Sequence, residues 1–123
     1  MITHIGCVVL YVADQEKSLD FYTNKLGFTE VTNAEMAPGK RWIEVAPPGA
    51  STTFTLTKAA DFDVEPGSAT APTMRCDDLQ QTYDQLRTAG VDVSEPITEP
   101  WSSYIVVTDP DGYTLVVSEP SQG

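Results

Sequence analysis

Few residues of this chain have an imidazole or thiol side chain, the groups best suited to binding a transition metal or to nucleophilic chemistry. His4 is the only histidine, and the two cysteines are Cys7 and Cys76. A histidine close to a cysteine could begin a transition-metal site or a nucleophile–base pair. However, His4 and Cys7 are three positions apart, and side chains alternate between the two faces along a strand. If Cys7 faces a pocket, His4 faces away, so we interpret His4 as a structural or surface residue.

Three aspartates that look like a carboxylate cluster have a structural explanation. Asp77, Asp109 and Asp111 fall at helix-cap and turn positions, so we assign them no catalysis. Glu44 is different because it alternates with Trp42 in the strand-like segment KRWIEVA. On a pocket face these two side chains would offer a hydrogen-bond acceptor and a stacking surface. The alternative is that Trp42 packs at a dimer interface and Glu44 is solvated.

The charge of the chain excludes some classes of partner. There are 18 acidic and 7 basic residues, a formal net charge of −11. Contacts to phosphate need Lys and Arg, so we expect neither a nucleic-acid partner nor an anionic membrane surface. The same charge would attract a cationic ligand. We expect no targeting or membrane-spanning segment, and thiols that stay reduced in the cytoplasm.

The first half of the chain, residues 2–58, predicts one helix and four strands. Asp14 is a good helix N-cap, and Gly27 follows the last helical residue as a C-terminal cap. Apolar and β-branched runs, separated by Pro and Gly turns, predict the strands. Their expected ranges are 2–13, 28–35, 41–46 and 51–58.

The second half repeats this order. Residues 59–69 are acidic and contain Pro-Gly, which predicts a linker. In residues 70–119 a helix capped by Asp77 or Asp78 ends at Gly90. The expected strands cover 70–76, 91–98, 104–108 and 113–118. The sequence therefore predicts one α+β domain over residues 1–123, built from two tandem β-α-β-β-β modules.

Two segments carry a family resemblance, LYVADQEKSLDFYTNKLGF in the first module and DPDGYTLVV in the second. They resemble the vicinal oxygen chelate superfamily, which includes glyoxalase I, extradiol dioxygenases, fosfomycin-modifying enzymes and bleomycin-resistance proteins. The resemblance covers nearly the whole chain. It implies that the two modules form a curved mixed sheet, or cup, and that the protein is a homodimer.

The resemblance also implies four metal-ligand positions, usually two His and two Glu. In this chain they fall on Cys7, Thr55, Ala71 (or Thr70) and Val116. Ala and Val cannot bind a transition metal, and a neutral Thr hydroxyl is a poor ligand. We therefore expect neither a metal nor another cofactor.

These observations predict a metal-free small-molecule binding protein. Its role would resemble that of bleomycin-resistance proteins, which sequester a drug or natural product, here aromatic or hydrophobic. Trp101 and Tyr104 could cap the pocket, although a packing role for Trp101 is the alternative. The expected ligand-binding residues are Cys7, Val9, Tyr11, Trp42, Glu44, Thr55, Trp101, Tyr104 and Val116.

The alternative function is an enzyme of the glyoxalase or dioxygenase type. It could bind a metal through unrecognised ligands such as His4, Glu30 and Glu44. It could also be a cofactor-free isomerase or cyclase with Glu44 as the base. The second version predicts a Glu44 carboxyl whose pKa is raised in a dry pocket.

Overall fold

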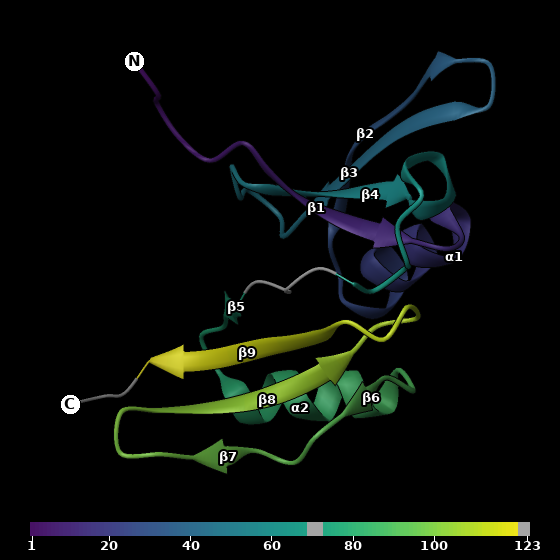
Figure 1. Ribbon diagram of the computed structural model, residues 1–123. Coiled ribbons are helices and arrows are strands. Elements are labelled where there is room, and N and C mark those ends of the chain that lie inside the picture. Colours follow the sequence, from purple (N-terminus) through teal and green to yellow (C-terminus); the bar gives the residue numbers. More distant parts are fainter. Residues whose placement is uncertain (69–72, 121–123) are drawn as a thin grey trace. The chain divides into compact units, whose positions relative to one another are not determined.

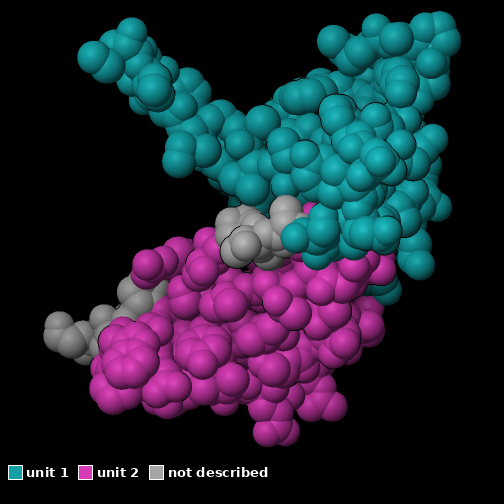
Figure 2. Space-filling view, in the orientation of Figure 1, with its two compact units in different colours: residues 1–69 teal, residues 70–123 magenta. Residues whose placement is uncertain are grey.

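The computed structural model describes residues 1–68 and 73–120. Its contacts divide the chain into two compact units, residues 1–69 (unit 1) and residues 70–123 (unit 2), which Figure 2 shows in different colours. Each unit has its own sheet and its own helix (Figure 1). The α+β class and the repeat of strands around one helix are confirmed.

Unit 1 has the predicted β-α-β-β-β order. Its sheet runs in the order β1-β4-β3-β2, with β1 parallel to β4 and the other pairs antiparallel. A π-helical turn, η1, continues α1, and a short 3₁₀ helix, η2, follows β4. The elements are β1 (Cys7–Val12), α1 (Gln15–Asp20), η1 (Phe21–Lys25), β2 (Thr29–Ala37), β3 (Lys40–Ala46), β4 (Thr53–Lys58) and η2 (Ala59–Phe62).

Unit 2 repeats this plan with one broken strand. In its sheet β5 is parallel to β9, and β8 is antiparallel to β9, β6 and β7. The strand expected over 91–98 is two short strands, because Pro96 between them has no N–H to donate to a ladder. The elements are β5 (Thr73–Arg75), α2 (Leu79–Thr88), β6 (Asp92–Val93), β7 (Ile97–Thr98), β8 (Ser102–Thr108) and β9 (Thr114–Pro120).

Most other strand ends lie within two residues of the prediction, and two segments differ by more. The first strand begins at Cys7 and not at residue 2, and the N-terminal end of the chain extends away from the sheet of unit 1 (Figure 1). The carbonyls of Ile5 and Gly6 still accept hydrogen bonds from Thr52 and Thr53, although the side chains of Ile2 and Ile5 are exposed. The expected linker contains η2, so part of it is ordered helix. The start of the strand expected at residues 70–72 lies outside the described residues.

Side-chain caps fix where both helices begin. The Asp14 carboxylate accepts hydrogen bonds from the Glu16 and Lys17 amides, as expected of an N-cap. For the second helix the sequence offered either Asp77 or Asp78 as the N-cap. Asp78 is the cap, because its Oδ1 accepts a hydrogen bond from the Gln81 amide at 3.0 Å.

One face of each sheet is covered by the helix of its own unit. In unit 1 the Tyr22 ring packs against Phe54 and Phe28, with ring centroids 5.7 and 5.6 Å apart. In unit 2, α2 contacts β6, β8 and β9 and buries Leu79 and Tyr83. We call the opposite face of each sheet its open face.

Candidate functional site

The open face of unit 1 is set by the alternation of β4. Phe54 packs against the helical side, so its neighbour Thr55 faces the other way. Strand pairing then places Val9, Glu44 and Thr32 beside Thr55, in one row across all four strands. This row lies at the centre of the open face.

Six of the nine expected ligand-binding residues share this face. They come from three strands, β1, β3 and β4, and their orientation follows from the pairing register. The structure therefore brings these six residues onto one surface, and their contact with a ligand stays a prediction. They are Cys7, Val9, Tyr11, Trp42, Glu44 and Thr55.

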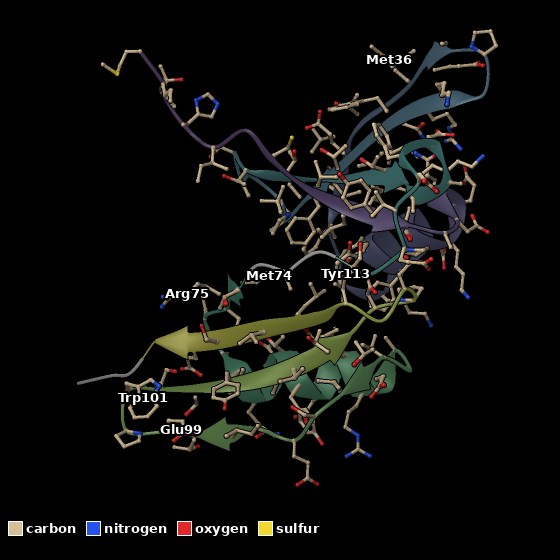
Figure 3. The ribbon with its side chains drawn as sticks, in the orientation of Figure 1. Met36, Met74, Arg75, Glu99, Trp101 and Tyr113 are labelled. Atoms are coloured by element: carbon tan, nitrogen blue, oxygen red, sulfur yellow. The ribbon has the colours of Figure 1, made fainter. Side chains whose placement is uncertain are left out.

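The other three expected residues belong to unit 2. Tyr104 and Val116 lie on its open face, where Tyr104 pairs with Ser118 and Val116 pairs with Val106. Trp101 lies in the turn between β7 and β8 and is exposed (Figure 3). Arg75 shares the row of Tyr104 and Ser118, and the described residues place no carboxylate within ion-pair distance of it.

Glu44 is held by two donors on the same face. The Trp42 indole donates to Oε1 at 2.5 Å, and the Thr53 hydroxyl donates to Oε2 at 2.6 Å. These hydrogen bonds, that of Thr53 first, lower the pKa of the Glu44 carboxyl, and burial only partly opposes them. Donors to a carboxylate favour its charged form. Glu44 is therefore an ionised acceptor with a fixed orientation.

Thr55 is buried with its hydroxyl unsatisfied. Its side chain is 1% exposed, and Oγ1 has no hydrogen-bond partner among the described residues. Buried hydroxyls normally have a partner, because leaving one unpaired costs free energy. This orphan group is directly opposite Glu44 across the β3–β4 pair.

A groove of about 390 Å³ adjoins this row in unit 1. Its volume lies within the range of small-molecule sites, roughly 300–1,000 Å³. Its apolar side chains are well exposed: Trp42 is 40% exposed, Phe62 61% and Met36, near the hairpin tip in Figure 3, 71%. The lining residues are Met36, Lys40, Arg41, Trp42, Thr57, Lys58, Asp61 and Phe62.

Met36 and Phe62 were missed from the sequence. Phe62 lies in the segment assigned to a linker, where η2 turns it toward the sheet and sets its ring 6.2 Å from that of Tyr11. In the sequence, Phe62 is a single aromatic residue in an otherwise acidic stretch. Nothing in that pattern indicates that its ring packs beside Tyr11. Met36 lies near the turn of a long hairpin, a position that ordinarily suggests solvent exposure.

Two of the cations that line the groove already have partners. Lys40 Nζ is 3.0 Å from Asp61 Oδ1. Arg41 donates to Glu16 and to the Asn33 side-chain oxygen. The groove therefore offers a ligand its aromatic and thioether surface together with the third cation, Lys58.

The second cysteine belongs to unit 2. Cys76 lies just before α2, and burial is the main cause that raises the pKa of its thiol. Nearby carboxylates, Glu119 first, act in the same direction. A raised pKa keeps the thiol protonated at neutral pH, and the thiol is a poor nucleophile.

The donor set does not fit the metal that the family resemblance implies. Of the positions carried over, Cys7 alone is a good transition-metal ligand, and Ala71 lies outside the described residues. The part of the chain that the structure describes has no group of three His, Cys, Asp or Glu side chains arranged to hold an ion.

The alternative metal set is wrong. Glu30 pairs with Val45 and so lies on the helical side of the sheet, whereas Glu44 lies on the open face. His4 is in the exposed arm, where Nδ1 is 2.9 Å from the Thr3 hydroxyl. These three side chains do not meet.

Within the described residues, no helix is long and apolar enough to span a bilayer.

Comparisons with known proteins agree with this fold. Residues 2–117 match the Glyoxalase/Bleomycin resistance protein/Dioxygenase superfamily. The protein YetH of Bacillus subtilis is 33% identical over 120 residues, which cover 97% of this chain and 100% of YetH.

Two crystal structures are similar along nearly their whole length. TnmS3, an antibiotic binding protein from Streptomyces sp. CB03234, has 33% identity and a TM-score of 0.88, with 98% of each chain covered. A superfamily member from Sphaerobacter thermophilus also has 33% identity and a TM-score of 0.88, with 96% of this chain and 98% of that one covered. The chain therefore belongs to the Glyoxalase/Bleomycin resistance protein/Dioxygenase superfamily.

Proposed function

We propose that this protein binds an aromatic, largely apolar small molecule on the open face of unit 1 and holds it without transforming it. The observation that carries the proposal is the groove beside Trp42, with Phe62 and Met36 exposed along it. Apolar area removed from water there stabilises a complex by about 25 cal/mol per Å² before association costs.

The similarity to TnmS3 supports the binding of a small molecule. TnmS3 is an antibiotic binding protein, and its identity to this chain is 33% over nearly the full length. We infer a drug or natural product as the ligand and sequestration as the role, in the manner of bleomycin-resistance proteins. For Trp101, Tyr104 and Val116 of unit 2, contact with the ligand stays a prediction of the sequence.

The state of Glu44 favours binding over general-base catalysis. A catalytic base needs a pKa close to the working pH, which for a carboxyl means a raised value. The hydrogen bonds from Thr53 and Trp42 lower the pKa of Glu44 instead. The cofactor-free enzyme with Glu44 as its base therefore lacks the feature on which it depends.

Three further properties belong to this proposal. We infer that no metal takes part, because the residues at the family's ligand positions include Val116 and Thr55. We infer a homodimer from the family resemblance. We infer a cytoplasmic location, with which the free thiols of Cys7 and Cys76 accord.

The proposal is tested with β-naphthyl methyl ether, an aromatic probe without a hydrogen-bond donor. We expect saturable binding by isothermal titration calorimetry. Trp42→Ala or Phe62→Ala should weaken binding about tenfold, since either change removes stacking and buried area worth roughly 1–2 kcal/mol.

Ile5→Ala is the matched control, because Ile5 is an exposed apolar residue of the N-terminal arm outside the groove. It should bind the probe like the unaltered protein. Absence of saturable binding, or equal weakening by all three variants, would contradict a ligand site at the groove.

A further inference from the structure

Glu44 keeps free acceptor capacity after its internal hydrogen bonds are counted. Each carboxylate oxygen has two lone-pair positions. Oε1 accepts from the Trp42 indole, and Oε2 accepts from the Thr53 hydroxyl. One lone pair on each oxygen is left over, and Glu44 is only half-buried. The carboxylate can therefore accept from a third donor without giving up its present partners.

Thr55 supplies the complementary group. Its hydroxyl is buried, lacks a partner in the described part of the chain, and can both donate and accept. Thr55 and Glu44 are directly paired in the antiparallel ladder, so their Cβ atoms are about 4.5–5.5 Å apart on the same face. An atom bound to the Glu44 carboxylate on this face would be a neighbour of the Thr55 side chain, and its contact with the buried hydroxyl requires the adjacent side chains to move aside.

The pair adjoins the aromatic groove. Trp42 and Thr57, which line the groove, are each two residues from Glu44 and Thr55 along the same strands. A two-residue step returns to the same face and spans roughly 6.5–7 Å, about the width of a fused aromatic ring system. A flat ligand on Trp42 can therefore place a ring substituent at Glu44.

We propose that Glu44 and Thr55 form a hydroxyl-recognition subsite, which selects aromatic ligands that carry a hydroxyl group. This inference rests on the proposed function and specifies its ligand class. The ligand hydroxyl donates its hydrogen to Glu44 and accepts the hydrogen of Thr55. Both free groups of the protein are satisfied by one ligand oxygen.

A ligand ammonium group fits this pair less well. An ammonium donates to Glu44 but has no lone pair, so it cannot accept the hydrogen of Thr55. It would leave the buried hydroxyl without an acceptor. A hydroxyl is the smallest group that completes both hydrogen bonds, although the acidic surface attracts cations at long range.

The test compares three probes that share one ring system: β-naphthol, its methyl ether and β-naphthylmethylamine. Dissociation constants are measured at neutral pH, where naphthol is neutral. We expect naphthol to bind at least about tenfold more tightly than the ether, the effect of one good hydrogen bond to a charged group. Thr55→Val and Glu44→Gln should each reduce the ratio of the naphthol affinity to the ether affinity several-fold.

Two control variants match these changes. Glu95→Gln removes the same charge from an exposed residue of unit 2, and Thr114→Val removes an exposed strand hydroxyl. Both should keep the preference for naphthol. The thermal midpoint checks folding, and Thr55→Val should raise it because the unpaired hydroxyl is gone.

The outcomes separate the two proposals. Equal binding of naphthol and its ether would overturn the hydroxyl subsite while leaving the aromatic groove intact. Tighter binding of the amine than of naphthol would also overturn it, because charge and not the hydroxyl would then decide affinity. Absence of binding by any probe would overturn the proposed function and this inference with it.

Discussion

The side chain of Glu44 is fixed by two neighbours on its own sheet face, the indole of Trp42 and the hydroxyl of Thr53. Both are donors, so both favour the ionised carboxylate. Desolvation would tend to raise the pKa of an isolated carboxyl beside an apolar groove. Here the hydrogen bonds outweigh that effect, and the residue serves as an acceptor.

The lowered pKa of Glu44 predicts a pH dependence of stability. Its folded-state pKa lies below the ordinary value of 4.5, so the folded chain holds its proton less tightly than the unfolded chain. The stabilisation from this group is complete above the unfolded pKa and is lost as pH falls through the folded pKa. The stability difference between the unaltered protein and Glu44→Gln should therefore shrink as pH falls from about 6 to about 3.

Urea unfolding at a series of pH values measures this difference directly. Glu95→Gln is the control, because it makes the same chemical change at an exposed position of unit 2. Its stability difference should vary less with pH than that of Glu44→Gln. A Glu44→Gln difference that stays constant over the same range would contradict the assignment of Glu44 as a hydrogen-bonded carboxylate.

Among the elements, the alternation of side chains along each strand determines which residues face the groove. Side-chain caps determine where each helix begins. β4 shows the first effect, since Phe54 and Leu56 are buried with the helical side while Thr55 and Thr57 face the groove side. Asp78 shows the second, because its carboxylate accepts from the third residue of α2. That bond satisfies one of the amides that a helix start leaves open.

The cap assignment predicts unequal effects of two adjacent substitutions. Asp78→Ala should lower the free energy of unfolding by about 1 kcal/mol, the usual cost of losing an N-cap. Asp77→Ala, at an exposed position that does not cap the helix, should change it by less than about 0.5 kcal/mol. Urea denaturation of the two variants measures both values, and an equal loss would show that Asp77 shares the capping role.

For the whole molecule, the family resemblance and the residues at the ligand positions point in different directions. The superfamily includes metal-dependent enzymes, and this chain has Cys7, Thr55, Ala71 and Val116 where ligands would be. Fold alone does not determine function, and the chemistry of the site has to decide. Side chains of this kind build a pocket wall better than a coordination sphere.

The donor chemistry predicts that the purified, untagged protein carries no stoichiometric transition metal. Cells are grown with added Ni, Zn, Mn, Fe and Co, and elemental mass spectrometry gives the ratio of metal to chain. We expect a ratio near zero, because one thiol does not hold a divalent ion against water and buffer. A ratio near one ion per chain would contradict the metal-free proposal and favour glyoxalase-like or dioxygenase chemistry.

The sequence by itself determined the order of elements and the alternation of faces. Both follow from local rules: Asp14 caps a helix, Gly27 and Gly90 end one with positive φ, and period-two patterning assigns each strand residue to a face. The repeat of these signals fixed the two-module plan. The prediction of one continuous strand over 91–98 was wrong, because the effect of Pro96 depends on the hydrogen-bonded ladder with β8.

The tertiary structure alone decided which residues meet. Phe62 reaches Tyr11, 51 positions away in the chain. Glu44 gains Thr53 of the neighbouring strand β4 and Trp42 of its own strand as partners. The unpaired hydroxyl of Thr55 is visible only once burial and every neighbour are known. Local patterning gives the direction of a side chain, whereas its hydrogen bonds, and therefore the pKa of Glu44, depend on strand register and packing.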